Sequence, residues 1–395
     1  AWNYAVSFGL NVPNVVLLGG EYTIHQPLLF KVTSQPSYSQ YSIVAPSLIG
    51  LAGYHDEDQT PTVPFGVSIS CASDFPKGEY AIAYICPDTP FVSGGNNPEF
   101  TSSLLENFNL LNNNLGAGIF LANWGDSKAS GIGIFDPTIP NPVITKGLST
   151  AQQNAQTGAF VITSTDNSGE YSIYDHIAIR GGSYLDGFVL NQYAGPNDFR
   201  NLWVTSSAQR YGFNLNAGGT YPILLINPEC DMGNRPPYSG TVPSGYPQSA
   251  NYLINGDVIM INPNQFIGSP NGMPFIYTYN GNVHIIGGVI MGSNSPTTGN
   301  LPVIYGYPHD VILDHVKVYI NSAYYGILGD NITRSNGGNV YVRNLVIADL
   351  NTGSPLSGLK LFNINWGSNY TWYSSIDVRD INSNLSNPNL IPLLP

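Results

Sequence analysis

The chain has 395 residues, of which only 10% are charged, and its net charge is −12 with a sequence pI of about 4.7. It contains no cluster of lysine and arginine, which excludes a basic face for nucleic acid or for an anionic membrane surface. No apolar run approaches the roughly 18 residues of a membrane-spanning helix, and a hydrophobic content of 42% excludes disorder. Glycine, proline and tyrosine are plentiful, with 43, 30 and 26 residues, which favours strands and turns over helices.

The N-terminal region, residues 1–113, is predicted to contain the first coils and a cap of a strand solenoid. Asn14 to Phe30 reads as strand, turn and strand, and His55 to Pro64 reads as a loop. Ser102 to Gly116 has apolar residues at helical spacing, so it is the best helix candidate. A cap is expected because exposed strand edges at the end of a stack promote aggregation.

Residues 114–386 carry a repeating phrase with a period of about 28 residues. Its first part is a polar or small residue followed by an apolar-x-apolar triplet, and a glycine or proline with a similar triplet follows. The first part begins at His176, Asn201, Asp257, Gly287, His315, Asn344 and Ser375. Alternating triplets place two apolar residues on one face. The repeat therefore predicts an all-β solenoid with at least two short strands in each coil, and the proline-containing tail 387–395 is expected to leave the ladder.

This repeat resembles the right-handed parallel β-helix of the pectin-lyase-like superfamily over roughly Gly116 to Ile381. The superfamily contains hydrolases, lyases, epimerases and non-catalytic adhesins, so the resemblance implies an architecture and leaves the function open. The short motifs of polygalacturonase-like members are absent. The alginate-epimerase-like motif is broken, because Tyr211 and Gly212 are followed by Phe213 and then Asn214 instead of an acidic residue. The resemblance is thus to a tailspike-like or adhesin-like member without the catalytic motifs.

The residues that begin each repeat form a polar column, which is expected to satisfy backbone groups in the turns. One position earlier, Asp175 and Arg200 fall on adjacent coils, and so do Asp314 and Arg343. Opposite charges one coil apart predict ion pairs between strands. The alternative is that such an arginine holds a carboxylate of a ligand.

A candidate catalytic pair lies further along the same pattern. Asp349 and Asp380 are predicted on adjacent coils, with Arg379 beside the second. A separation of about 4.8 Å between coils is similar to the carboxyl separation of about 5–5.5 Å in retaining glycosidases. The alternative is a pair of turn residues neutralised by Arg379.

The loop at His55 to Pro64 concentrates three carboxylates, Asp56, Glu57 and Asp58. Oxygen-rich loops bind Ca²⁺, which makes these residues the candidate metal ligands. The spacing of an EF-hand is absent, and the alternative is a solvated acidic loop. No other cofactor is predicted.

Several features suit a secreted protein. The chain begins with alanine, which is interpreted as a mature chain after removal of a signal peptide, although a trimmed chain would begin in the same way. Cys71 and Cys86 are candidates for a disulfide. Asn331, Asn369 and Asn384 stand in Asn-x-Ser/Thr triplets and are candidate glycosylation sites.

Aromatic residues crowd the last third of the chain, and they are the candidate surface for a ligand or for assembly. Ordinary packing is the alternative. The candidates are Tyr324, Tyr325, Trp366, Tyr370 and Trp372.

These observations support three functional hypotheses. The first is a structural protein of a cell or virion surface (a spike, an adhesin or a filament subunit) that associates with itself as a filament or trimer or contacts a surface glycan. The second is a secreted polysaccharide-active enzyme, a hydrolase or lyase, and the third is a non-catalytic carbohydrate-binding protein. The scarcity of catalytic motifs favours the first. The low charge also predicts stability that changes little with acidity, as in a thermoacidophile, because few protonation states can differ on folding.

Overall fold

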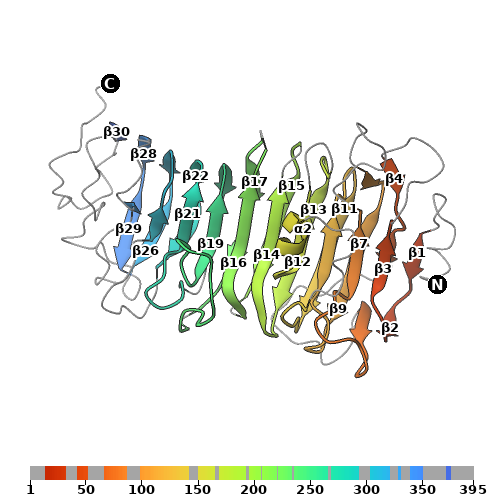
Figure 1. Ribbon diagram of the computed structural model, residues 1–395. Helices are drawn as coiled ribbons and strands as arrows, with labels where there is room; N and C mark the ends of the chain where they lie inside the picture. The colour runs from red at the N-terminus through yellow and green to blue at the C-terminus, as the bar shows by residue number, and fades with distance from the viewer. Residues whose placement is uncertain are drawn as a thin grey trace. The chain divides into compact units, whose positions relative to one another are not determined.

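The computed structural model describes residues 14–32, 42–51, 66–86, 98–141, 150–164, 169–192, 195–205, 207–219, 221–233, 235–265, 268–292, 303–320, 328–330, 339–349 and 371–374. The chain divides into two compact units. Unit 1 comprises Ala1–Ala208 with Asn216–Tyr221, and unit 2 comprises Gln209–Leu215 with Pro222–Pro395. Each unit is a right-handed parallel β-helix, which confirms the predicted fold class (Figure 1).

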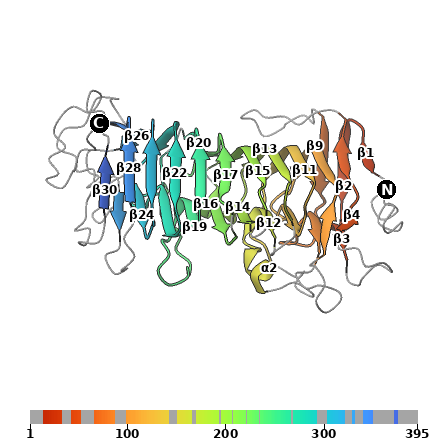
Figure 2. The same cartoon turned by 90° about the horizontal axis from the view of Figure 1, so that it is seen from above.

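Unit 1 contains two main parallel sheets. The first sheet has the order β1 (Val15–Leu17), β5 (Leu48–Gly50), β9 (Leu104–Leu111), β11 (Lys128–Phe135), β13 (Ile173–Arg180) and β15 (Asp198–Val204), and β6 (Val67–Cys71) joins β2 (Gly20–Ile24) to β9. The second has the order β3 (Leu28–Lys31), β7 (Ile82–Ile85), β10 (Ile119–Ala122), β12 (Gly158–Thr163) and β14 (Tyr184–Gln192). A small sheet pairs β4 (Ser42–Val44) with β8 (Glu99–Thr101), and the helix α2 (Thr150–Ala155) lies outside the strands (Figure 2).

Unit 2 contains three parallel sheets. The first has the order β17 (Ile223–Ile226), β20 (Val258–Ile261), β22 (Val283–Ile286), β25 (Val311–Asp314), β28 (Asn339–Arg343) and β30 (Thr371–Ser374). The second has the order β16 (Ala208–Ala217, of which Gln209–Leu215 belong to this unit), β19 (Ala250–Asn255), β21 (Ile276–Asn280), β24 (Ile304–Gly306) and β27 (Leu328–Asp330). The third has the order β23 (Val289–Met291), β26 (Lys317–Ile320) and β29 (Val346–Asp349), and β18 (Glu229–Cys230) makes a parallel bridge to Asn264.

A left-handed residue makes a corner within several of the described coils. In β13 the register passes from Asp175 to Ile177 and leaves out His176, whose φ is 53°. This extra residue shifts the alternation by one position, so Tyr174 before the corner and Ile177 after it both point into the core. Asparagine, histidine and glycine suit the position because they tolerate positive φ better than most residues. Most residues of the polar column predicted from the sequence are thus the corner residues of successive coils.

The helix predicted over Ser102 to Gly116 is wrong, because this segment forms β9 and a turn. Its inward residues Leu105 and Phe108 are three positions apart, since the corner residue Asn107, with a φ of 60°, lies between them. A corner in a β-helix therefore places inward apolar residues three positions apart, which is also the spacing expected for an α-helix.

Parallel pairing begins upstream of residue 113, in the region predicted to hold the first coils and a cap. β1 already pairs with β5 through Val15 and Leu48, and β5 pairs with β9 through Leu48 and Leu105. The strands upstream of residue 113 thus belong to the same stack as those downstream. The tail 387–395 lies outside the described residues.

Aromatic side chains fill much of the interior of unit 1. Tyr174 stacks on Phe199 at 5.1 Å between ring centroids and contacts Trp124 at 5.7 Å. Trp124 also faces Tyr84 at 6.5 Å, and all four rings are fully buried. Buried aromatic rings remove a large apolar area from water, so these four rings contribute to the stability of unit 1.

Buried phenols make the fold sensitive to high pH. Burial raises the pKa of Tyr84 and of Tyr174 above the ordinary value for tyrosine. An unfolded chain releases these protons above about pH 10, whereas the folded chain retains them. The free energy of unfolding is therefore expected to be constant up to about pH 9 and to fall as the pH rises further. Guanidinium unfolding at about pH 8 and about pH 11 checks this, and equal stability at both pH values would contradict it.

The predicted disulfide between Cys71 and Cys86 is wrong. Both are free and buried, as is Cys230. Cys71 ends β6 in the first sheet of unit 1, whereas Cys86 follows β7 in the second sheet, so their positions follow different strand ladders.

Thiol titration tests this correction. Burial raises the pKa of Cys71 to about 12, and an un-ionised buried thiol is a poor nucleophile. We expect no reaction with an aromatic disulfide reagent in the native chain and reaction of all three cysteines in guanidinium. One reactive thiol after unfolding without reductant would show that two cysteines are joined.

No helix in the described part of the chain is long and apolar enough to cross a membrane.

Candidate functional site

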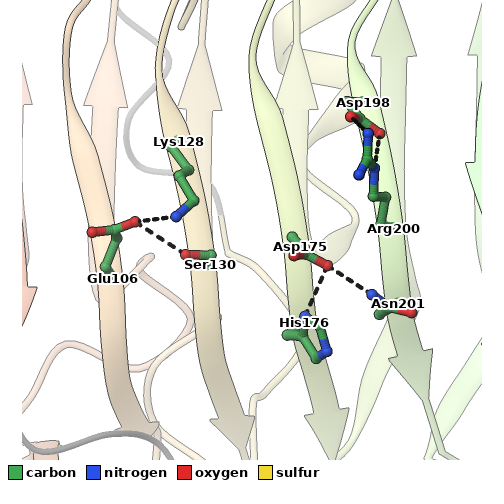
Figure 3. Close-up of polar contacts among 8 residues, drawn as sticks. All are labelled: Glu106, Lys128, Ser130, Asp175, His176, Asp198, Arg200 and Asn201. Carbon is green, nitrogen blue, oxygen red and sulfur yellow. Dashed lines mark hydrogen bonds and ion pairs between the residues drawn. The ribbon is translucent and has the colours of Figure 1, made fainter.

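A row of polar side chains crosses the outer face of the first sheet of unit 1. The parallel register places Glu106 beside Ser130, Ser130 beside Asp175 and Asp175 beside Arg200, on four successive strands. The alternate residues on these strands, such as Tyr174, are buried in the core, so the row points outward. We call this set the polar row. Its members are Glu106, Lys128, Ser130, Asp175, His176, Asp198, Arg200 and Asn201 (Figure 3).

Asp175 is held by the two corner residues. His176 Nδ1 lies 2.8 Å from Asp175 Oδ1, and Asn201 Nδ2 donates to the same oxygen at 2.8 Å. Both corner residues have positive φ. The corners thus fix a partly exposed carboxylate at the centre of the row.

Arg200 is held by a carboxylate of its own strand. Its Nε donates to Asp198 Oδ1 at 2.6 Å, and a second guanidinium nitrogen contacts Asp198 Oδ2. The pKa of Arg200 is raised, first by this hydrogen bond, then by the charge of Asp198, with a smaller contribution from Asp175. The register predicted for Asp175 and Arg200 is confirmed. The main partner of Arg200, however, is Asp198, because residues two apart on a strand share a face.

At the other end of the row, Glu106 binds two side chains of β11. Lys128 Nζ lies 2.7 Å from Glu106 Oε1, and Ser130 Oγ donates to the same oxygen at 3.2 Å. Together the row has three carboxylates against two permanent cations, so it presents many charged groups with little net charge.

Unit 2 contains a second copy of the central constellation. Asp314 and His315 on one coil are followed by Arg343 and Asn344 on the next, as Asp175 and His176 are followed by Arg200 and Asn201. His315 Nδ1 lies 2.6 Å from Asp314 Oδ1, and Arg343 Nε lies 3.9 Å from that oxygen. The predicted ion pair between coils is confirmed here.

The two copies differ at one position. Where unit 1 has Asp198, two residues before its arginine, unit 2 has Tyr341. Without that carboxylate, Arg343 contacts Asp314 on the neighbouring coil, and Asn344 Nδ2 lies 2.8 Å from His315 Nε2. Only the copy in unit 1 therefore combines two carboxylates with an arginine.

One member of the predicted column belongs elsewhere. Asp257 precedes β20, and its Oδ1 accepts a hydrogen bond from the backbone N–H of Asn282 at 2.8 Å. The side chain of Asn282 in turn accepts from the N–H of Asp310 at 3.0 Å. The corner residue of that coil is Asn262, with a φ of 50°. Asp257 thus begins a separate ladder that supports the turn before the strands.

An aromatic group adjoins the polar row beyond the corner. The guanidinium carbon of Arg180 lies 3.8 Å from the centre of the Trp203 ring, which is a cation–π contact. Trp203 Nε1 is buried and has no hydrogen-bond partner among the described residues. Arg180 and Trp203 thus form an aromatic edge on the segments of β13 and β15 that follow the corner residues His176 and Asn201.

Most of the site residues predicted from the sequence cannot be compared with the structure. The backbone of Asp349 closes β29 beside Ile320, and Trp372 lies in β30 beside Val340, but their side chains are outside the described part of the chain. The other predicted residues lie wholly outside the described residues: Arg379, Asp380, Tyr324, Tyr325, Trp366, Tyr370, Asp56, Glu57, Asp58, Asn331, Asn369 and Asn384.

The described residues contain no group of three or more histidine, cysteine or acidic side chains that would hold a metal ion.

Sequence reasoning missed Glu106, Lys128 and Asp198 as members of an outward row. The signal for Asp198 was available, because it alternates with Arg200 in a strand pattern. Glu106 was hidden by the mistaken helix. The polar row offers hydrogen-bond donors and acceptors on one accessible face, and its chemistry suits a hydroxyl-rich ligand.

Comparison with known proteins shows the fold. No protein-family profile and no curated protein matches the sequence. The chain is similar to the catalytic domain of a GH87 alpha-1,3-glucanase in complex with tetrasaccharides, with a TM-score of 0.50 and 11% identity over 91% of this chain. A structure of the same kind of domain in complex with nigerose has a TM-score of 0.44 and 11% identity. The chain spans 63% of the length of each neighbour. At this identity the likeness establishes a parallel β-helix, in agreement with the superfamily resemblance.

Proposed function

We propose that the chain binds an uncharged polysaccharide along the polar row of unit 1. The observation that carries the proposal is the alignment of carboxylates and cationic donors on successive coils. Glu106, Asp175 and Asp198 accept hydrogen bonds from hydroxyl groups, and Lys128 and Arg200 donate to hydroxyl and ring oxygens. Each of these side chains is already oriented by a neighbour.

The balance of charge on the row favours an uncharged ligand. Three carboxylates stand against two permanent cations, and the whole chain is acidic, with a net charge of −12. An anionic polymer would meet repulsion from this surface. A neutral glycan exchanges its hydrogen bonds with water for charge-assisted bonds to the row, which are stronger than neutral ones.

The length of the row suits an extended ligand. It crosses β9, β11, β13 and β15, and three steps of about 4.8 Å give roughly 14 Å. This span fits several sugar units of an oligosaccharide, with Trp203 at the edge as an aromatic surface for a sugar ring.

The structural neighbours support this proposal more than the expectation of a spike, adhesin or filament subunit. The domain with a TM-score of 0.50 is the catalytic domain of an alpha-1,3-glucanase in complex with tetrasaccharides. Binding of a glycan at a cell or virion surface remains compatible with this function. Secretion, self-association, glycosylation and Ca²⁺ binding at Asp56, Glu57 and Asp58 remain proposals.

The first experiment is affinity electrophoresis of the full chain in gels that contain dissolved dextran, laminarin or mannan, with sedimentation on insoluble alpha-1,3-glucan in parallel. We expect retardation or co-sedimentation with at least one neutral polysaccharide. In gels that contain only the anionic polymer dextran sulfate, we expect no retardation. Normal migration in every neutral gel and no co-sedimentation would contradict the proposal.

Hydrolysis is a second candidate function, and one observation favours it. Asp175 and Asp198 lie on adjacent strands, two residues out of register. A lateral step of about 4.8 Å and two residues of about 3.3 Å along the strand place their Cα atoms about 8 Å apart. Inverting glycosidases use two carboxyl groups with a water molecule between them, one as acid and one as base, and two outward side chains at this Cα spacing leave room for such a water.

Release of reducing ends from the retained polysaccharide tests hydrolysis. If the two carboxylates are catalytic, Asp175→Asn and Asp198→Asn each lower the rate by at least about 100-fold while the polysaccharide is still retained in gels. Retention by the wild-type chain without any release would restrict the function to binding.

A further inference from the structure

Five tyrosines form a compact group on the outside of the second sheet of unit 2. Tyr246 stacks on Tyr279 with 4.8 Å between ring centroids and an interplanar angle of 13°. Tyr277 lies between Tyr246 at 6.4 Å and Tyr305 at 5.9 Å, and Tyr307 meets Tyr279 edge-on at 6.4 Å. We call these five residues the tyrosine cluster.

The strands β21 and β24 position most of the cluster. Tyr277 pairs with Tyr305 in the parallel register, whereas their neighbours Ile276 and Ile304 are buried in the core. Tyr279 is an additional residue, because the register passes from Thr278 to Asn280 across a β-bulge. Bulges re-aim side chains, and this one directs the Tyr279 ring onto Tyr246.

A loop between β18 and β19 supplies the remaining ring. The hydroxyl of Tyr277 donates to the carbonyl of Gly245, and that of Tyr211 donates to the carbonyl of Pro247 at 2.9 Å. The backbone N–H of Tyr238 donates to Ser249 Oγ at 2.9 Å and closes the loop. Tyr246 is therefore fixed over the sheet before any ligand arrives.

Part of the cluster remains accessible. Tyr277 is buried at the centre, whereas Tyr246, Tyr279, Tyr305 and Tyr307 are only half-buried. Tyr305 pairs with Gly329 on the next coil. Half-exposed aromatic rings with hydroxyl groups present both an apolar face and a hydrogen-bonding edge.

The segments that carry the five tyrosines contain no charged residue, and Arg210 of β16 lies 4.9 Å from the centre of the neighbouring Tyr211 ring. The loop from Pro236 to Ser249 and the strands β19, β21 and β24 contain no aspartate, glutamate, lysine or arginine. An ionic ligand would find no counter-charge in these segments. A partner with a purely apolar face would offer no hydrogen-bonding group to the hydroxyl-bearing edges of the rings. A neutral sugar offers apolar C–H faces together with hydroxyl groups, and it fits both conditions.

We propose that the tyrosine cluster is a second carbohydrate site, one that binds a neutral hexose unit of a polysaccharide by stacking on Tyr279, Tyr305 and Tyr307. This site shares its ligand class with the polar row but none of its residues, and it lies wholly within unit 2. The proposal for this site can therefore be tested independently of the proposed function of unit 1.

The test uses the full chain and dextran, a soluble uncharged glucan. Tyr279→Ala and Tyr307→Ala are each expected to weaken retention in dextran gels by at least about fivefold, within the range that loss of one aromatic contact produces. Tyr279→Phe, which keeps the ring, is expected to retain most of the binding. Tyr221→Ala, which removes an isolated tyrosine that is 48% exposed in unit 1, is the matched control and is expected to change nothing.

The same measurements distinguish this proposal from its rivals. Unchanged retention of both alanine variants, at unchanged melting temperature, overturns it. So does sedimentation that shows a dimer of the wild-type chain dissociating in Tyr279→Ala, because the cluster would then be an interface between two copies. Loss of retention in Tyr279→Ala with normal retention in Arg200→Ala supports the tyrosine cluster and contradicts the polar row, and the reverse pattern does the opposite.

Discussion

Replacement of Tyr174 by alanine is expected to lower the free energy of unfolding by about 3–5 kcal/mol. Tyr174 is fully buried, stacks on Phe199 at an interplanar angle of 15°, and contacts Trp124 and Phe160. Its removal leaves a cavity within an aromatic stack that a rigid strand ladder cannot close. Guanidinium unfolding, followed by circular dichroism, measures the change.

Two variants control this prediction. Tyr174→Phe keeps the ring and loses a long hydrogen bond of 3.4 Å to the carbonyl of Trp124 and a contact with the Ser172 side chain, so it is expected to cost about 1 kcal/mol. Tyr171→Ala removes a side chain that is 59% exposed and is expected to change stability by less than about 0.5 kcal/mol. A loss below about 1 kcal/mol for Tyr174→Ala would contradict the described packing.

Replacement of Arg200 by alanine is expected to lower affinity for the retained polysaccharide about tenfold or more, the size expected when a charge-assisted hydrogen bond to a ligand is lost. The side chain is half exposed and Asp198 holds it in place. Its loss also frees Asp198 to repel Asp175 across one coil. Stability is expected to change little, because exposed ion pairs contribute little to folding. Isothermal titration with an oligosaccharide of that polysaccharide measures the affinity.

Arg343→Ala is the matched control for this prediction. It removes the corresponding arginine of unit 2. Asp314 and Asn344 stand beside Arg343 as Asp175 and Asn201 stand beside Arg200, but there is no carboxylate two residues upstream of Arg343. Its affinity is expected to stay within about twofold of the wild type. Equal losses of affinity in both variants would show that the group of Asp, His, Arg and Asn common to both units binds the ligand, and not the extended polar row of unit 1. No loss in Arg200→Ala would contradict the polar row as the binding site.

The sequence contained enough information for the architecture. Apolar triplets recurring about every 28 residues could only be buried by stacking, and the corner residues His176, Asn201, His315 and Asn344 were found in one column because positive φ restricts which residues stand there. The same corner misled the interpretation of Ser102 to Gly116, since an additional residue at Asn107 changes a period of two into an apparent helical spacing.

The site was less predictable because it depends on contacts between coils. The register of Asp175 with Arg200 followed from the repeat. The preference of Arg200 for Asp198 depends on side-chain geometry that spacing does not contain. The tyrosine cluster forms because the loop that carries Tyr246 packs onto a sheet. The periodicity of the sequence does not predict such a contact. Likewise, cysteine spacing cannot show that Cys71 and Cys86 end up on different sheets.

Binding of a polysaccharide across β13 and β15 of unit 1 has a direct test. Hydrogen exchange of the full chain, with and without an oligosaccharide of the polysaccharide that is retained most strongly, tests it most directly. We expect slower exchange in peptides that cover Ile173–Arg180 and Asp198–Val204, because a bound glycan shields the outer face of these strands and damps their opening. Unchanged exchange in both peptides at saturating oligosaccharide would contradict the account.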